Sequence, residues 1–223
     1  NKTTTTLISG LVVLSLVQAL GQPESPKSSS AAVTATTPDS VNGALFWIPE
    51  PGFLLPVREA SAHEAVLESE RVKKVLARWE DEKLTVLPLR DKAAAIAIAG
   101  SDFQERTDAA ADAELAGAHE IKVRSQGGVV EAVILSSERE TFCAALFAPS
   151  LHGKFSELLG GEFYAAMPTR FRMYLFPKLG GRPEAFAGAV LSDYRASPAP
   201  VSPELFEIGE NRPPRAAGVL DDR

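Results

Sequence analysis

The sequence predicts an α+β protein: a single domain with a mostly antiparallel sheet and packed helices, preceded by a signal peptide and a disordered tether. Three observations support this prediction. Strand-like segments are joined by short glycine-containing turns, which is typical of antiparallel hairpins. Helical segments are interleaved with these hairpins, whereas a doubly wound parallel sheet would need strands and helices in regular alternation. The first 42 residues differ in composition from the rest of the chain.

Length and charge restrict the classes of function. The 223 residues contain 45% hydrophobic and 23% charged side chains, carry a net charge of -6 and include one cysteine, Cys143. A domain of this size can bury a core without disulfides or metals. One cysteine excludes a disulfide scaffold and an all-cysteine zinc site. The acidic balance argues against nucleic acid as the main partner, because phosphate binding needs a positive field.

The N-terminal segment is typical of a signal peptide. Residues 7–20 form an apolar run, which is shorter than the ~20 residues that span a membrane but suits a signal-peptide core. Lys2 precedes the run, and the small residues Ala19 and Gly21 follow it. We therefore predict cleavage between Gly21 and Gln22, export to the periplasm or the cell exterior, and no membrane span after cleavage. A buried helix or an uncleaved anchor is the alternative.

Composition also sets the expected domain boundaries. Residues 22–42 are rich in Ser, Pro, Thr and Ala, with too little apolar surface to offset their ordering entropy, and predict a disordered linker. The α+β domain is expected over residues 43–208. Residues 209–223 carry Pro213, Pro214 and a charged end, and predict a flexible C-terminal tail.

The first half of the domain contains these expected elements. Prolines 49, 51 and 56 make residues 46–57 suitable for an edge strand or an extended arm. A capping-box pattern at Ser61–Glu64 predicts a helix over residues 61–79, with Val72, Val75, Leu76 and Trp79 on one face. Strands are expected at residues 84–90 and 93–99. Thr107 is expected to cap an alanine-rich helix that ends at Ala116.

The second half predicts two hairpins with helices between and after them. Residues 121–125 and 129–136 flank a Gln-Gly-Gly turn, and residues 163–168 and 171–177 form the second hairpin. Residues 141–148 suit a strand or a helix equally. Ser150 is expected to cap a helix that ends at Gly160 and Gly161. A helix over residues 183–194 and a strand at 205–208 complete the domain.

The stretch from Val130 to Ile208 resembles the YtpQ-like family of uncharacterised bacterial proteins. The matching parts are the apolar run at 141–147, the segment LLGGEFYAAMPTR, the following FRMYLFP and the later SPELF. The chain departs from the family at Phe171, where the family usually has an acidic residue, and in having a signal peptide. The resemblance implies an α+β fold and provides no catalytic residue.

Few residues suggest catalysis. The motif Gly160-Gly161-Glu162-Phe163 resembles the diguanylate cyclase signature but lacks its consecutive acidic pair. Cys143 could form a thiol nucleophile with His119 or His152, although its apolar surroundings favour an inert thiol. His63 is expected in the first turn of a helix. We find no zinc-binding spacing and no serine-hydrolase motif, and we expect neither metal nor cofactor.

Two clusters of charge remain. The first is acidic, is expected to form a solvated helix face, and comprises Asp102, Glu105, Asp108, Asp112 and Glu114. The second is basic, surrounds the second hairpin, is a candidate site for an anion or a partner, and comprises Arg170, Arg172, Lys178 and Arg182. The expected function is that of an exported, non-enzymatic binding or structural domain, with a protein or envelope partner. The alternative is a hydrolase with an unrecognised active site.

Overall fold

The computed structural model describes residues 43–55, 68–88, 93–94, 96–97, 100–125 and 127–221. These residues belong to one compact unit, Pro38–Arg223. The predicted signal peptide, its cleavage site at Gly21 and Gln22, the linker and His63 lie outside the described residues. They therefore stay predictions.

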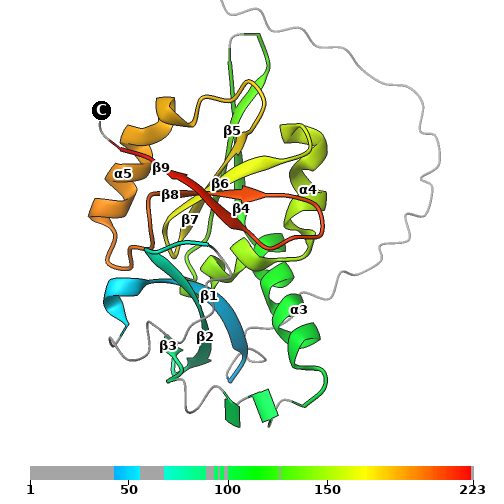
Figure 1. Ribbon diagram of the computed structural model, residues 1–223, viewed down its shortest axis with the longest axis vertical. Helices are drawn as coiled ribbons and strands as arrows, with labels where there is room; N and C mark the ends of the chain where they lie inside the picture. The colour runs from blue at the N-terminus through cyan, green and yellow to red at the C-terminus, as the bar shows by residue number, and fades with distance from the viewer. Residues whose placement is uncertain are drawn as a thin grey trace, which may run out of the picture. The chain divides into compact units, whose positions relative to one another are not determined.

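A six-stranded antiparallel sheet forms the centre of this unit (Figure 1). Its strand order is β4-β5-β7-β6-β8-β9. The strands are β4 (His119–Arg124), β5 (Val130–Ser136), β6 (Phe163–Thr169), β7 (Arg172–Pro177), β8 (Glu204–Ile208) and β9 (Arg215–Val219). Both predicted hairpins are confirmed, as β4–β5 and β6–β7. The α+β prediction is also confirmed.

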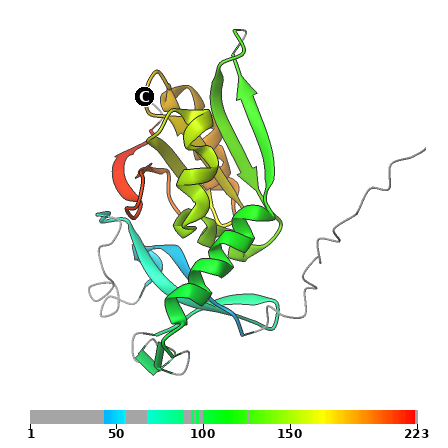
Figure 2. The same ribbon diagram turned by 90° about the vertical axis from the view of Figure 1, so that its right-hand side faces the viewer.

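Helices cover both faces of this sheet. Successive side chains of each strand point to opposite faces, so each strand contributes to the packing on both. The helices α3 (Phe103–Ala116) and α4 (Ser150–Leu159), with the 3₁₀ helix η3 (Glu140–Phe147), pack on one face (Figure 2). The helix α5 (Ala187–Ala196), which follows the 3₁₀ helix η4 (Pro183–Phe186), covers the other face. Two hydrophobic cores result, one on each face of the sheet.

A smaller three-stranded sheet has the order β1-β2-β3. It comprises β1 (Leu45–Pro51), β2 (Val72–Glu80) and β3 (Lys83–Val86), and the short 3₁₀ helix η2 (Gly52–Leu54) follows β1. As predicted, the proline-containing segment forms an edge strand, β1. Proline lacks a backbone N–H, and at an edge this group is not needed for hydrogen bonding to a second neighbouring strand. The 3₁₀ helix η3 packs against β1 and also against β6 and β7, so it connects the two sheets.

The predicted helix over residues 61–79 is wrong for its second half, because Val72–Glu80 is the central strand β2. Its apolar residues match helical spacing, but a central strand is covered on both faces and need not alternate strictly. A tight turn then leads into β3, with positive φ at Asp81 (50°) and Glu82 (60°). This turn contains no glycine, so the usual signal of a two-residue hairpin is missing here.

Three other expectations are corrected. Within 93–99, the described residues 93, 94, 96 and 97 are helical rather than extended. The helix α3 begins at Phe103, and the Thr107 hydroxyl donates to the Gln104 carbonyl inside it, at 2.9 Å. The expected flexible tail instead forms β9, which pairs with β8 and is followed by the buried Leu220. Backbone pairing and this one apolar anchor order a segment whose composition suggested disorder.

The remaining helices lie where the sequence predicts them. The ambiguous residues 141–148 lie mostly in the 3₁₀ helix η3. The helix α4 ends at Gly160 in the left-handed conformation (φ 89°), as the glycine pair predicted. The helix at 183–194 and the strand at 205–208 are confirmed as η4–α5 and β8. Among the described helices, none is both long and apolar enough to cross a membrane.

Candidate ligand-binding groove

The structure separates the four cations that the sequence places around the second hairpin. Arg170 lies in the turn between β6 and β7, where its guanidinium donates to Glu50 on β1 at 2.8 Å and to Glu140 on η3 at 3.2 Å. Burial raises the pKa of Glu50 above its usual value, although Arg170 acts to lower it. Arg170 thus joins the two sheets.

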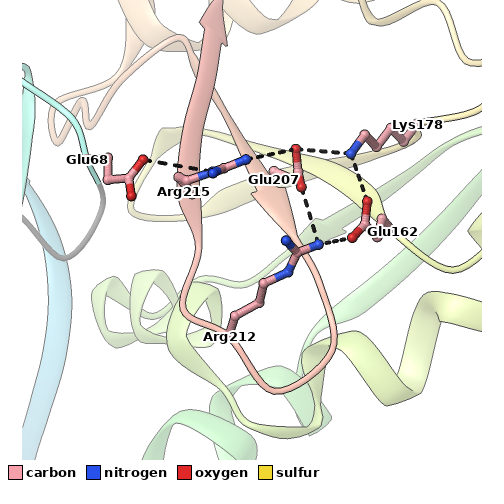
Figure 3. A network of polar contacts seen from close by, with 6 residues as sticks. All are labelled: Glu68, Glu162, Lys178, Glu207, Arg212 and Arg215. Atoms are coloured by element: carbon pink, nitrogen blue, oxygen red, sulfur yellow. Dashed lines mark hydrogen bonds and ion pairs between the residues drawn. The ribbon is translucent and has the colours of Figure 1, made fainter.

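Lys178 belongs to a network of alternating charges that connects the end of β7 and the start of β6 to the β8–β9 hairpin (Figure 3). Glu207 on β8 lies at its centre, with Lys178 at 3.1 Å, Arg212 at 3.3 Å and Arg215 at 3.8 Å. Glu162 pairs with both Lys178 and Arg212. The positive charge of Lys178 is therefore neutralised by carboxylates of the same chain. Arg182 lies apart from this network, exposed immediately before η4.

Arg172 lines a groove of about 550 Å³ between the hairpins and the C-terminal end of α5. Its Nη1 donates to both carboxylate oxygens of Asp193 on α5, at 3.0 and 2.9 Å. The Tyr174 hydroxyl donates to the same carboxylate at 2.5 Å. Burial and the neighbouring Asp193 raise the pKa of Tyr174 to about 12, so its hydroxyl stays protonated near neutral pH. Two donors on β7 thus hold Asp193 in place.

The strand register extends this polar wall across the sheet. His119 on β4 is paired with Ser136 on β5, and Ser136 is paired with Arg172 on β7. Paired residues project from the same face, and neighbouring strands lie ~4.8 Å apart, so the three side chains form a row. The remaining residues that line the groove are Ser137, Glu138, Thr169, Phe171, Ala196 and Ser197.

Of the predicted candidates, this groove brings together only Arg172 and His119. Sequence reasoning missed Ser136, Tyr174 and Asp193. The strand alternation could have placed Tyr174 on the same face as Arg172. Nothing local connects either residue to Asp193, which is 21 residues away from Arg172 on a separate helix.

Comparison with family models, with curated proteins and with solved structures gives no match. The resemblance to the YtpQ-like family therefore stays a prediction.

The thiol of Cys143 is unsuited to nucleophilic chemistry in this structure. Its side chain is fully buried on η3, and its Sγ donates to the Glu140 carbonyl at 3.2 Å. Burial raises the pKa of the thiol well above its usual value. His119 lies in the groove, and the His152 ring stacks on Phe163. Within the described residues, no hydrogen bond joins Cys143 to a histidine.

We therefore expect the native protein to react with a thiol reagent such as Ellman's reagent only through unfolding. In native buffer at pH 8 the modification of Cys143 should be at least ~100-fold slower than in 6 M guanidinium chloride, because only the exposed thiolate reacts. Absorbance of the released chromophore measures both rates. Rapid stoichiometric labelling in native buffer would contradict the buried position.

The acidic cluster on α3 is only partly the solvated face that we expected. Glu114 is buried and accepts a hydrogen bond from Thr141 at 2.7 Å, with Arg139 at 2.8 Å. Asp112 accepts from both the backbone N–H and the hydroxyl of Ser150, and so caps α4. Ser150 is thus the capped residue rather than the cap. In the described part of the chain, no group of three His, Cys, Asp or Glu side chains could hold a metal ion.

Proposed function

We propose that this chain is an exported, non-enzymatic domain of the bacterial envelope or exterior, and that it binds a partner or envelope component in the groove around Arg172. The apolar run at residues 7–20 supports export. The resemblance of residues 130–208 to the YtpQ-like family supports a bacterial origin. The observation that carries binding is the guanidinium of Arg172, which Asp193 holds at a groove about 550 Å³ in volume.

The groove offers fixed donors and acceptors on a sheet, which is how binding sites are pre-organised. Arg172 engages Asp193 through Nη1, and its side chain lines the groove and is 44% exposed, so the guanidinium is accessible to a ligand. Ser136 and His119 continue the row of polar groups. Such a row offers both donors and acceptors of hydrogen bonds to a ligand.

The balance of charge indicates the chemistry of the ligand. The positive charge of Arg172 is offset by Asp193, and Glu138 adds a second negative charge at the groove. An anion would be attracted by the guanidinium but repelled by these two carboxylates. An uncharged ligand rich in hydroxyl or amide groups meets no such repulsion and uses both donors and acceptors. Phe171 supplies an apolar surface for its carbon atoms. The hydrolase hypothesis, in contrast, loses the thiol of Cys143.

A blocking substitution tests this proposal without removing any member of the polar row. Ala196 is exposed, lies on α5 and lines the groove, so Ala196→Trp should fill it. We expect Ala196→Trp to weaken binding at least ~10-fold on an array of bacterial envelope glycans and peptides. Ala189→Trp is the matched control, because Ala189 is also exposed on the same helix and does not line the groove. Equal binding by the two variants, or no binding by the unmodified protein, would refute the proposal.

A further inference from the structure

A second groove, of about 860 Å³, runs along the outer edge of β9. One wall is the edge strand itself, with Ala217, Gly218 and Val219, and the other is the N-terminal part of α5, with Ala187 and Gly188. Tyr164 on β6 and Leu205 on β8 also line it, on the sheet face that α5 covers. In the strand order of the large sheet, β9 is the last strand on its side. This groove shares no residue with the polar groove around Arg172.

The backbone of β9 presents hydrogen-bonding groups to this groove. The Leu220 N–H donates to the Pro203 carbonyl at 3.0 Å, so these two residues face each other in a hydrogen-bonded pair. In an antiparallel ladder the next pair, Val219 with Glu204, is not hydrogen-bonded. The N–H and C=O of Val219 therefore point away from β8. Among the described strands, none pairs with this outer edge.

The opposite edge of the same sheet, β4, is protected against pairing with a further strand, whereas the edge at β9 is not. Strand β4 carries Glu120, Lys122 and Arg124 at alternate positions. Charged side chains of this kind discourage a further strand from pairing with an edge. After Arg215, β9 continues with only Ala216, Ala217, Gly218 and Val219. An uncharged edge beside a groove has the features of a site for strand addition.

Glycines leave the space that an added backbone needs. Gly218 is paired with Leu205, so its missing side chain opens the groove on the face covered by α5. Across the groove, a Cβ built on Gly188 would meet no atom within 4 Å. The apolar side chains of Tyr164 and Leu205 lie below this space. An extended chain can therefore reach the outer edge of β9 and direct alternate side chains onto these two residues.

We propose that the groove between β9 and α5 binds an extended segment of a partner protein by strand addition, with apolar side chains at alternate positions and a basic residue at its end. The apolar positions follow from Tyr164 and Leu205. The lining also contains two acidic residues, Glu184 and Asp221, and the basic Lys178, which is paired with Glu162 and Glu207. Because Glu184 is exposed, a basic residue at the end of the segment would be attracted to its carboxylate. A second copy of β9 fits less well, because on this face it would offer Gly218 in place of an apolar side chain.

The test uses a capped synthetic peptide, acetyl-Lys-Val-Thr-Val-Thr-Val-Lys-amide, as the probe for the full chain. We expect binding in calorimetry, and at least ~10-fold slower hydrogen exchange of the Val219 amide, because that N–H gains a partner. A peptide of the same sequence with N-methyl groups on alternate residues keeps the side chains but loses the backbone donors. Its affinity should fall at least ~10-fold.

Protein variants complete the test. Gly188→Trp should fill the groove and weaken peptide binding at least ~10-fold, whereas Ala189→Trp on the neighbouring exposed position should leave it unchanged. Ala196→Trp should also leave it unchanged, which separates this site from the polar groove. Absence of peptide binding, equal binding of the N-methylated peptide, or protection of Val219 through dimerisation without peptide would each overturn the proposal.

Discussion

Replacing Arg170 with alanine is expected to lower the free energy of unfolding by about 3–5 kcal/mol, because it leaves the Glu50 carboxylate buried without its cation. Glu50 is 4% exposed, and Arg170 holds it at 2.8 Å across the junction between the two sheets. Urea unfolding at pH 7, followed by circular dichroism, measures the change. The double variant Glu50→Gln/Arg170→Met should recover much of the loss, because it removes the buried charge as well.

The loss should also depend on pH. Burial raises the pKa of Glu50 above its usual value of 4.5 in the folded state. A raised pKa contributes stability that is fully present below pH 4.5 and is lost as the pH rises through the folded value. Removing Arg170 raises this pKa further, so acidification from pH 7 towards pH 4.5 should shrink the deficit of Arg170→Ala. An equal deficit at both pH values would show that the charge of Glu50 is not its cause.

A surface pair provides the control for this experiment. Arg78 and Glu80 are as close, at 3.0 Å, but both side chains are at least one-third exposed. Exposed pairs contribute about 0–1 kcal/mol, so Arg78→Ala should change stability little. If Arg170→Ala were as mild as Arg78→Ala, the buried pair would not hold the sheets together.

The second large effect is expected at Phe142, whose replacement by alanine should cost about 3–5 kcal/mol through lost burial and the cavity that remains. Phe142 is fully buried on η3, which packs against β1 and also against β6 and β7. The cavity would therefore weaken the contact between the two sheets. Differential scanning calorimetry should show one transition at a lower midpoint temperature, because both sheets share this core.

Phe53 on η2 is the matched control, since its side chain is 71% exposed. The same substitution there should change stability by less than about 0.5 kcal/mol. Two separate transitions in Phe142→Ala would instead indicate that the small sheet unfolds independently. A loss similar to that of Phe53→Ala would contradict the position of Phe142 between the sheets.

The hairpins of the large sheet could be predicted because their information is local. The turn at Gly128 (φ 78°) needs a conformation that glycine adopts easily, and the flanking strands carry apolar side chains. The end of α4 at Gly160 was predictable for the same reason. The turn between β2 and β3 uses Asp81 and Glu82 instead. Aspartate adopts positive φ more often than most residues, but glutamate does so rarely, so this pair is a weak turn signal. The preceding strand was accordingly mistaken for a helix.

The candidate groove was less predictable, because the residues of its polar wall come from β4, β5, β7 and α5. They are brought together only by strand pairing and by the packing of α5 on the sheet. Arg170 and Arg172 are two residues apart, yet Arg170 reaches β1 and η3 while Arg172 reaches α5. The chain reverses direction between the two arginines. No local sequence pattern predicts which carboxylate each arginine will contact. Charge in the sequence therefore identified Arg172 as a candidate but could not distinguish it from the structural Arg170.

The sequence by itself determined the α+β class, the two main hairpins and the proline-bearing edge strand. These features depend on backbone preferences and on contacts between residues that are close along the chain. Only the tertiary structure decided that Asp193 secures Arg172, that Cys143 is buried away from the histidines, and that β9 ends the sheet with an open edge. Each of these depends on packing between segments far apart in the chain, where burial and pairing outweigh local preference.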